Sequence, residues 1–172
     1  MTKMMFIRPP FKGMGRYVPP HLGIATLYNY LHGKFDWIEF SLVDALADAL
    51  DEEQIVKAIN YSRPDILAIT IKTMQVKQAK EIIERVKDIY NPLIICGGNH
   101  VSVSPQEFVR CGADYAIVGE GEEAIEKIIQ HEFGHYEESL DDCVNICTKN
   151  NVERSGFEPK VCVHGSDILF LI

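Results

Sequence analysis

"NPLIICGGNHVSVSPQEF", residues 91–108, contains one complete passage from a strand into a helix. Its apolar run, LIIC, is short and bounded by a turn signal, as is typical of a strand buried in a parallel sheet. The run stops at Gly97 and Gly98, and Ser104 followed by Pro105 has the pattern of a helix N-terminus. The stretch therefore predicts one strand–turn–helix unit. It also raises the question of why the strand should end in two glycines.

The same unit recurs along the chain. Five apolar runs alternate with five helical patterns, which predicts a parallel sheet with helices on both faces. We expect an α/β, flavodoxin-like, doubly wound fold with five parallel strands in the order 2-1-3-4-5. The expected strands cover residues 3–7, 36–45, 65–71, 93–96 and 113–119, and the expected helices cover 21–35, 51–62, 73–90, 104–112 and 122–133.

The pattern changes beyond the last of these helices. Residues 143–163, "CVNICTKNNVERSGFEPKVCV", read as a strand, an Asn-Asn turn and a second extended piece. We therefore expect one domain over residues 1–135 and a small β-ribbon or linker over 136–172. The apolar last residues, "DILFLI", suggest that the chain is cut from a longer protein or packs on a partner.

Composition narrows the class of protein. The chain has 172 residues, of which 47% are apolar and 24% charged, as in an ordinary globular domain. A net charge of −8 argues against a nucleic-acid partner. No apolar run approaches the roughly 20 residues of a membrane span, and no secretory signal is recognisable, so a cytoplasmic location is expected.

In the cytoplasm the cysteines are expected to be reduced thiols. Cys143 and Cys147 have the spacing that opens an iron–sulfur motif, but no third cysteine follows closely. Small apolar side chains are therefore the favoured interpretation of these cysteines.

In a parallel α/β sheet, ligands bind outside the carboxyl ends of the strands. Four of the five predicted strand ends carry glycine or hydroxyl residues, which let a ligand approach the backbone. Structural alternatives exist: a tight turn at the two glycines, a β-branched strand residue or a helix cap at the threonines, and a loop histidine. The coincidence on one edge favours a binding site, whose candidate residues are Thr70, Lys72, Thr73, Gly97, Gly98, Asn99, His100, Gly119, Glu120 and Gly121.

Several known types of site are excluded by motif. No GxxxxGK[ST] loop is present and no GxGxxG follows the first strand, which excludes the usual ATP and dinucleotide sites. The first strand ends in Arg-Pro-Pro rather than in the acidic cluster of a receiver domain. No Ser-His-Asp order or metal-ligand spacing stands out.

Four segments together resemble the N-terminal cobalamin-binding domain of cobalamin-dependent radical SAM enzymes. They are "RPP…YVPPHLGIATLYNYL", "VDALADAL…RPDILAITIKT", "LIICGGNHVSVSPQEF" and "CGADYAIVGEGEEAIEKII". The resemblance covers residues 4–133 and adds Pro20, His21 and Gly23, from the Pro-Pro segment that opens the first helix, to the candidate site.

The resemblance implies that cobalamin (vitamin B12) lies over the strand ends with its nucleotide tail in a slot beside the sheet. Gly97 and Gly98 would form a wall without side chains, so a valine at Gly98 is expected to block the slot and leave the fold intact. Thr70 stands where related corrinoid domains use the Ser of a Ser-x-Leu motif. Lys72 replaces the Leu, and either reaches the tail phosphate or merely fills the slot.

The cobalt ligand of corrinoid methyltransferase domains is the His of an Asp-x-His-x-x-Gly motif. Aligning Gly23 with the last position puts Val18 and Pro20 at the Asp and His positions, so the motif is absent. The resemblance therefore implies base-off cobalamin with no protein histidine on cobalt. The alternative ligand is His21, which is expected to begin the helix and point elsewhere.

The radical SAM motif Cys-x3-Cys-x2-Cys is also absent. We therefore expect no iron–sulfur cluster in this chain and no enzyme activity from it alone, but a role within or beside a radical SAM enzyme. Two alternatives remain. The first is a cofactor-free interaction module of the same fold, and the second is an enzyme on an unrelated flavodoxin-like fold.

Overall fold

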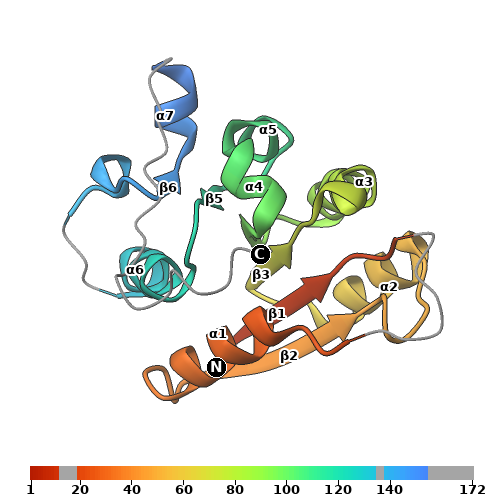
Figure 1. The fold of residues 1–172 in the computed structure, drawn as a ribbon. Coiled ribbons are helices and arrows are strands. Elements are labelled where there is room, and N and C mark those ends of the chain that lie inside the picture. Colours follow the sequence, from red (N-terminus) through yellow and green to blue (C-terminus); the bar gives the residue numbers. More distant parts are fainter. Residues whose placement is uncertain (12–18, 135–137, 155–172) are drawn as a thin grey trace.

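The computed structural model of the protein describes residues 1–11, 19–134 and 138–154. They form one mixed sheet with helices on both faces (Figure 1). The strand order is β2-β1-β3-β4-β5-β6, and strands β1 to β5 run parallel to one another. The predicted fold class and the order of five strands are confirmed. The strands are β1 (Thr2–Arg8), β2 (Ile38–Asp44), β3 (Ile66–Thr70), β4 (Leu93–Gly97), β5 (Tyr115–Ile117) and β6 (Ile146–Cys147).

The helices divide between the two faces of the sheet. Buried residues of α1 and α6 pack with one set of strand side chains, and those of α2, α3 and α5 pack with the other. The helices are α1 (Leu22–His32), α2 (Glu52–Ser62), α3 (Val76–Ile89), α4 (Asn99–Val103), α5 (Pro105–Arg110), α6 (Glu122–Phe133) and α7 (Lys149–Glu153), with 3-10 turns η1 (Thr73–Gln75) and η2 (Leu140–Asp142).

Strand alternation explains why the strands are continuously apolar. Phe6 and Ala68 face α1 and α6, whereas Ile7 and Ile69 face the opposite core. Successive side chains of a strand point to opposite faces, so a sheet covered on both sides needs apolar residues at every position. This alternation also decides which side chains reach the candidate site.

The segment after α6 differs from the predicted ribbon, and the sheet has six strands rather than five. Strand β6 pairs antiparallel with β5, with Ile146 opposite Ile117. The predicted Asn-Asn turn lies inside α7 instead. Thr148 caps that helix, because its Oγ1 accepts the N–H of Asn151 at 3.2 Å and its own N–H donates to Asn151 Oδ1 at 2.9 Å. This reciprocal cap stabilises a helix where composition alone indicated a turn. The second extended piece, from residue 155, lies outside the described residues, as do Cys162 and the apolar end.

The turn after β4 also contains a helix that the sequence did not indicate. Asn99 and His100, expected in a loop, are the first residues of α4. Pro105 does begin α5 as predicted, although the Ser104 side chain makes no capping hydrogen bond. Within the part of the chain that the structure describes, no helix is long and apolar enough to cross a membrane.

Candidate functional site

A cavity of about 660 Å³ opens at the carboxyl ends of β1, β3, β4 and β5, between α1 and α6. It brings together residues that are distant in sequence, from four successive strand ends. All but two of the predicted site residues line it: Pro20, His21, Gly23, Thr70, Lys72, Gly97, Gly98, Asn99, Gly119, Glu120 and Gly121.

The two exceptions are Thr73 and His100, which do not line the cavity and bond to each other instead. Nδ1 of His100 lies 3.2 Å from Oγ1 of Thr73, and its Nε2 lies 3.3 Å from a carboxylate oxygen of Glu107. Thr73 is the first residue of η1, with Lys72 at the N-cap position. These two side chains therefore brace the turn after β3 against α4 and α5.

The strand side chains of the cavity form two rows. In the inner row, Phe6 lies opposite Ala68, and Ala68 lies opposite Ile95. Two residues further along each strand is the rim row, in which Thr70 lies opposite Gly97. The rim row consists of Arg8, Thr70 and Gly97, and the inner row of Phe6, Ala68 and Ile95. Because Cys96 lies opposite Ala116, the lining residue Ile117 of β5 is level with Gly97, and Gly119 lies beyond it. The cavity is therefore apolar inside, and its rim is polar or without side chains except at Ile117.

Gly97 and Gly98 line the cavity for different reasons. A Cβ atom added at Gly97 would meet no atom within 4 Å, so this position opens on free space. Gly98 has φ of +106°, and a Cβ there would lie 2.8 Å from the backbone nitrogen of Ile71. The close approach arises because the N–H of His100 donates to the carbonyl of Ile71 at 3.1 Å. The side-chain-free wall is therefore Gly97, and Gly98 is required by the turn.

His21 was predicted to belong to the site without ligating cobalt, and the structure places its side chain at the cavity. It is the N-cap of α1, and its ring lines the cavity. Nδ1 accepts the N–H of Ile24 at 3.2 Å, so the neutral ring carries its proton on Nε2, 3.4 Å from Oγ1 of Thr70. Burial lowers the pKa of His21, and the positive charges of Arg8 and Lys72 lower it further. Both ring nitrogens are thus engaged by the protein itself.

The most important residue that the sequence did not single out is Arg8. Its side chain is only 3% exposed, and Nη1 donates to the carbonyl of Pro19 at 3.0 Å and to Oδ2 of Asp44 at 3.1 Å. These bonds fix the segment before α1 against the sheet. A charged residue directly after an apolar strand was the signal that could have identified it.

Ser102, which the sequence did not indicate as a site residue either, connects the turns after β4 and β5. Its hydroxyl donates to the carbonyl of Gly98 at 3.2 Å and accepts the N–H of Gly119 at 3.0 Å.

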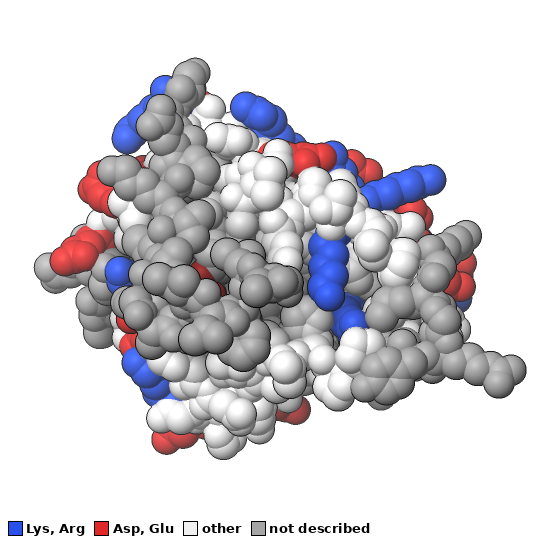
Figure 2. All heavy atoms as spheres, viewed as in Figure 1, with Lys and Arg blue, Asp and Glu red and all other residues white. Residues whose placement is uncertain are grey.

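Lys72 is exposed at the same rim. Figure 2 shows lysine and arginine side chains within a mostly uncharged area of the surface.

The two helical walls of the cavity contact each other. A Cβ at Gly121, before α6, would lie 3.3 Å from Cδ2 of Leu27 on α1. Further along, Glu126 accepts hydrogen bonds from Tyr30 at 2.6 Å and from Lys34 at 2.7 Å. Leu22 of α1 also lines the cavity and is 76% exposed.

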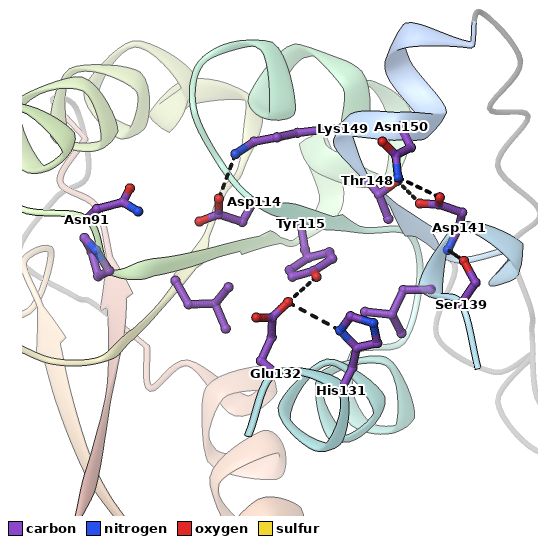
Figure 3. Close-up of a pocket in the computed structure, with 13 residues that line it drawn as sticks. Asn91, Asp114, Tyr115, His131, Glu132, Ser139, Asp141, Thr148, Lys149 and Asn150 are labelled. Carbon is purple, nitrogen blue, oxygen red and sulfur yellow. Dashed lines mark hydrogen bonds and ion pairs between the residues drawn. The ribbon is translucent and has the colours of Figure 1, made fainter. Parts of the chain in front are cut away.

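A second cavity, of about 550 Å³, lies at the amino ends of β4 and β5 and contains none of the predicted site residues (Figure 3). Its polar side chains bond to one another: Tyr115 donates to Glu132 at 2.5 Å, Lys149 pairs with Asp114 at 3.0 Å, and Asn150 contacts Asp141. Among the residues with a described position, no group of three or more His, Cys, Asp or Glu side chains could hold a metal ion. The hydrogen bonds and ion pairs around this cavity, together with the pairing of β6 with β5, therefore attach β6 and α7 to the core.

Sequence comparison matches residues 15–129 to the protein family described as the B12 binding domain. The chain is also 30% identical over 137 residues to an uncharacterized methyltransferase of Pyrococcus horikoshii, which covers 75% of this chain and 29% of that protein. It is 23% identical over 134 residues to the anaerobic magnesium-protoporphyrin IX monomethyl ester cyclase of Cereibacter sphaeroides, covering 74% of this chain and 22% of that protein. The chain thus spans less than a third of either relative.

Solved structures show the same fold. The cobalamin-dependent S-adenosylmethionine radical enzyme OxsB, with aqua-cobalamin and S-adenosylmethionine bound, superposes with a TM-score of 0.74 at 21% identity, covering 95% of this chain and 22% of OxsB. A cobalamin-binding protein from Desulfitobacterium hafniense gives a TM-score of 0.58 at 15% identity, over 77% of this chain and 59% of that one. At these identities the likeness establishes the fold alone.

Proposed function

The chain belongs to the B12 binding domain family, and from that premise we propose that it holds base-off cobalamin at the carboxyl ends of its strands, for a radical SAM domain or protein. The observation that carries the proposal is the two-row cavity, with a polar rim and an apolar interior. Cobalamin, when bound, supplies a cobalt centre able to carry a methyl group. The chain itself contributes binding, orientation and the exclusion of water.

The residues of the cavity suit the parts of this cofactor. The apolar interior would surround the base of the nucleotide tail, and Gly97 would let the tail lie against the end of β4. Thr70 accepts from His21, which leaves the threonine hydroxyl proton available to an acceptor on the tail. The ammonium group of Lys72, exposed at the rim, would meet the tail phosphate.

The two hydrogen bonds of the His21 ring support the proposal that no histidine of this chain ligates cobalt. Its Nδ1 is occupied by the cap of α1 and its Nε2 by Thr70, so ligation would cost both hydrogen bonds. Pro20, at the position of the usual ligand, has no side-chain donor. We accordingly propose that cobalt receives no nitrogen from this chain.

The proposal also covers the domain division of the chain, its location and its partner. Residues 1–135 would form the cobalamin-binding unit and residues 136–172 an extension of it. The site would work in the cytoplasm, and the chain would not be an enzyme alone. A radical SAM partner would supply the iron–sulfur cluster that a Cys-x3-Cys-x2-Cys motif binds.

The binding test is direct. Purified protein mixed with hydroxocobalamin should shift the visible spectrum of the corrinoid and retain it through gel filtration at about one equivalent. Loss of all corrinoid on the column would contradict the proposal and favour a cofactor-free interaction module. The base-off form is tested by electron paramagnetic resonance of the Co(II) state, which should show no nitrogen superhyperfine splitting. A splitting that disappears in His21→Ala would instead identify that histidine as a ligand.

A further inference from the structure

The inner row of the cavity has one position that differs from its neighbours. Ala68 is 7% exposed, whereas Phe6 is 2% and Ile95 is 1% exposed. Ala68 is also the smallest of the three and lies between Phe6 and Ile95. A small side chain between two large ones leaves a depression in the face of the sheet, and this depression is the floor of the slot.

The interior around this depression offers few hydrogen-bond partners. Its walls are Ile24 and Leu27 of α1 and Ile125 of α6, all apolar. The backbone groups of the floor are used in the sheet, because β3 is paired with β1 on one side and with β4 on the other along its length. Among the described lining residues, polar side chains such as Thr70 and Ser102 belong to the rim.

This chemistry distinguishes between kinds of lower base. Cobamides differ in the base of their nucleotide tail: a dimethylbenzimidazole has a largely apolar edge, whereas an adenine carries an exocyclic amine and additional ring nitrogens. A polar group that loses water without gaining a partner is destabilised in an apolar site. The adenine amine would meet only carbon atoms against Ala68, Ile95 and Ile117.

Building on the proposed function, we propose that the slot selects cobamides with a benzimidazole base over those with a purine base, and that Ala68 determines this selectivity. Thr70, at the boundary of rim and interior, then serves the ring nitrogen that a base-off benzimidazole leaves free. Selectivity arises from the unpaired polar atoms of the purine and not from its size.

The test compares three probes by absorbance titration: hydroxocobalamin, its adenine-bearing analogue, and cobinamide, which lacks the nucleotide tail. Hydroxocobalamin should bind at least about tenfold more tightly than the adenine analogue, and cobinamide more weakly than hydroxocobalamin. Equal affinity for the two complete cobamides would overturn the inference. Cobinamide binding as tightly as hydroxocobalamin would also overturn it, while leaving corrinoid binding itself intact. Failure of all three to bind would refute the proposed function, and this inference with it.

The variant Ala68→Ser tests whether Ala68 determines the preference for a benzimidazole base. The added hydroxyl gives the adenine amine a partner, so the preference should fall to about threefold or less. Ala116→Ser is the matched control, because Ala116 is fully buried on the opposite face of the sheet and should leave the preference unchanged. An unaltered preference in folded Ala68→Ser, or an equal fall in the control, would show that Ala68 is not the determinant.

Discussion

Gly97 and Gly98 are adjacent, yet each is glycine for its own physical reason. Gly97 ends β4 with open space where a side chain would stand, whereas Gly98 adopts a backbone conformation that L-residues rarely adopt, against the backbone of Ile71. Only the first arrangement leaves open space in which a ligand could lie. The sequence could indicate that two glycines were needed here, but it could not assign the two roles, because both look the same in a strand-end turn.

The two glycines therefore give opposite phenotypes when replaced by valine. Gly97→Val should weaken hydroxocobalamin binding by at least about tenfold and leave the urea unfolding midpoint nearly unchanged, since the side chain enters free space. Gly98→Val should destabilise the fold by roughly 3 kcal/mol or more through clash and backbone strain. This reverses the expectation from sequence, in which Gly98→Val spared the fold. Absorbance titration measures the binding of both variants, and urea unfolding measures their stability. A Gly98→Val variant that is stable but does not bind would contradict the assignment of Gly98 to the turn.

His21 should make the stability of the protein sensitive to pH. Burial, Arg8 and Lys72 lower its pKa in the folded state, so protonation favours the unfolded chain, in which the pKa is about 6.5. The stabilising contribution is complete above that value and is lost as pH falls through the lower folded pKa. His21→Asn keeps an N-cap side chain but does not titrate. Between pH 7 and pH 5 the urea midpoint of the unaltered protein should fall further than that of His21→Asn, and parallel profiles would contradict the assignment.

At the scale of elements, Asp114 links three parts of the fold that the sequence separates widely. Its carboxylate accepts the N–H of Ile94 in β4 at 2.9 Å, and pairs with Lys87 of α3 at 3.1 Å and Lys149 of α7 at 3.0 Å. Burial acts to raise the pKa of Asp114, but the bonds from Ile94, Lys149 and Lys87 outweigh it, and the pKa is lowered. The extension after α6 is thus held to the core by charge as well as by β6.

Asp114→Asn should therefore cost about 1–3 kcal/mol of stability at pH 7, because it weakens hydrogen bonds to a charged group. The folded pKa is depressed, so the carboxylate contributes fully above the unfolded value of about 3.9 and loses its effect as pH falls through the folded pKa. The difference in urea midpoint should narrow toward pH 4 and below. Asp88→Asn, an exposed aspartate of α3, is the control and should change the midpoint little. A constant difference at all pH values would argue against this ionised network.

At the scale of the whole molecule, the sequence predicted the parallel sheet and its strand order through β5, and most of the candidate residues it selected line one cavity. The resemblance to the cobalamin-binding domain of cobalamin-dependent radical SAM enzymes is confirmed. These features rest on the regular alternation of apolar runs with helical patterns and on the residues at the strand ends. A strand was predicted where β6 lies, but its pairing with β5 was not predicted. The helix α7 was interpreted as a turn, because five residues carry no periodicity.

The site itself was predicted only at its rim. Thr70, Gly97 and Gly119 were found because they interrupt apolar strands, whereas Ala68, Ile95 and Ile117 resemble ordinary core residues. Counting back two positions from each of the first three would have identified these apolar residues, since alternation places both on one face. The orientation of His21 could not be predicted in this way, because it depends on a hydrogen bond across 49 positions of the chain.

The antiparallel strand β6 has a consequence for the behaviour of the protein at high concentration. A strand at the border of a sheet presents unpaired N–H and C=O groups, on which another chain can assemble and initiate aggregation. Here Ala116 and Ile117 of β5 are paired with Cys147 and Ile146, so that border is closed from within the molecule. A chain shortened before Ile146 would expose it, and would become prone to precipitate for a reason unrelated to its ability to bind a corrinoid.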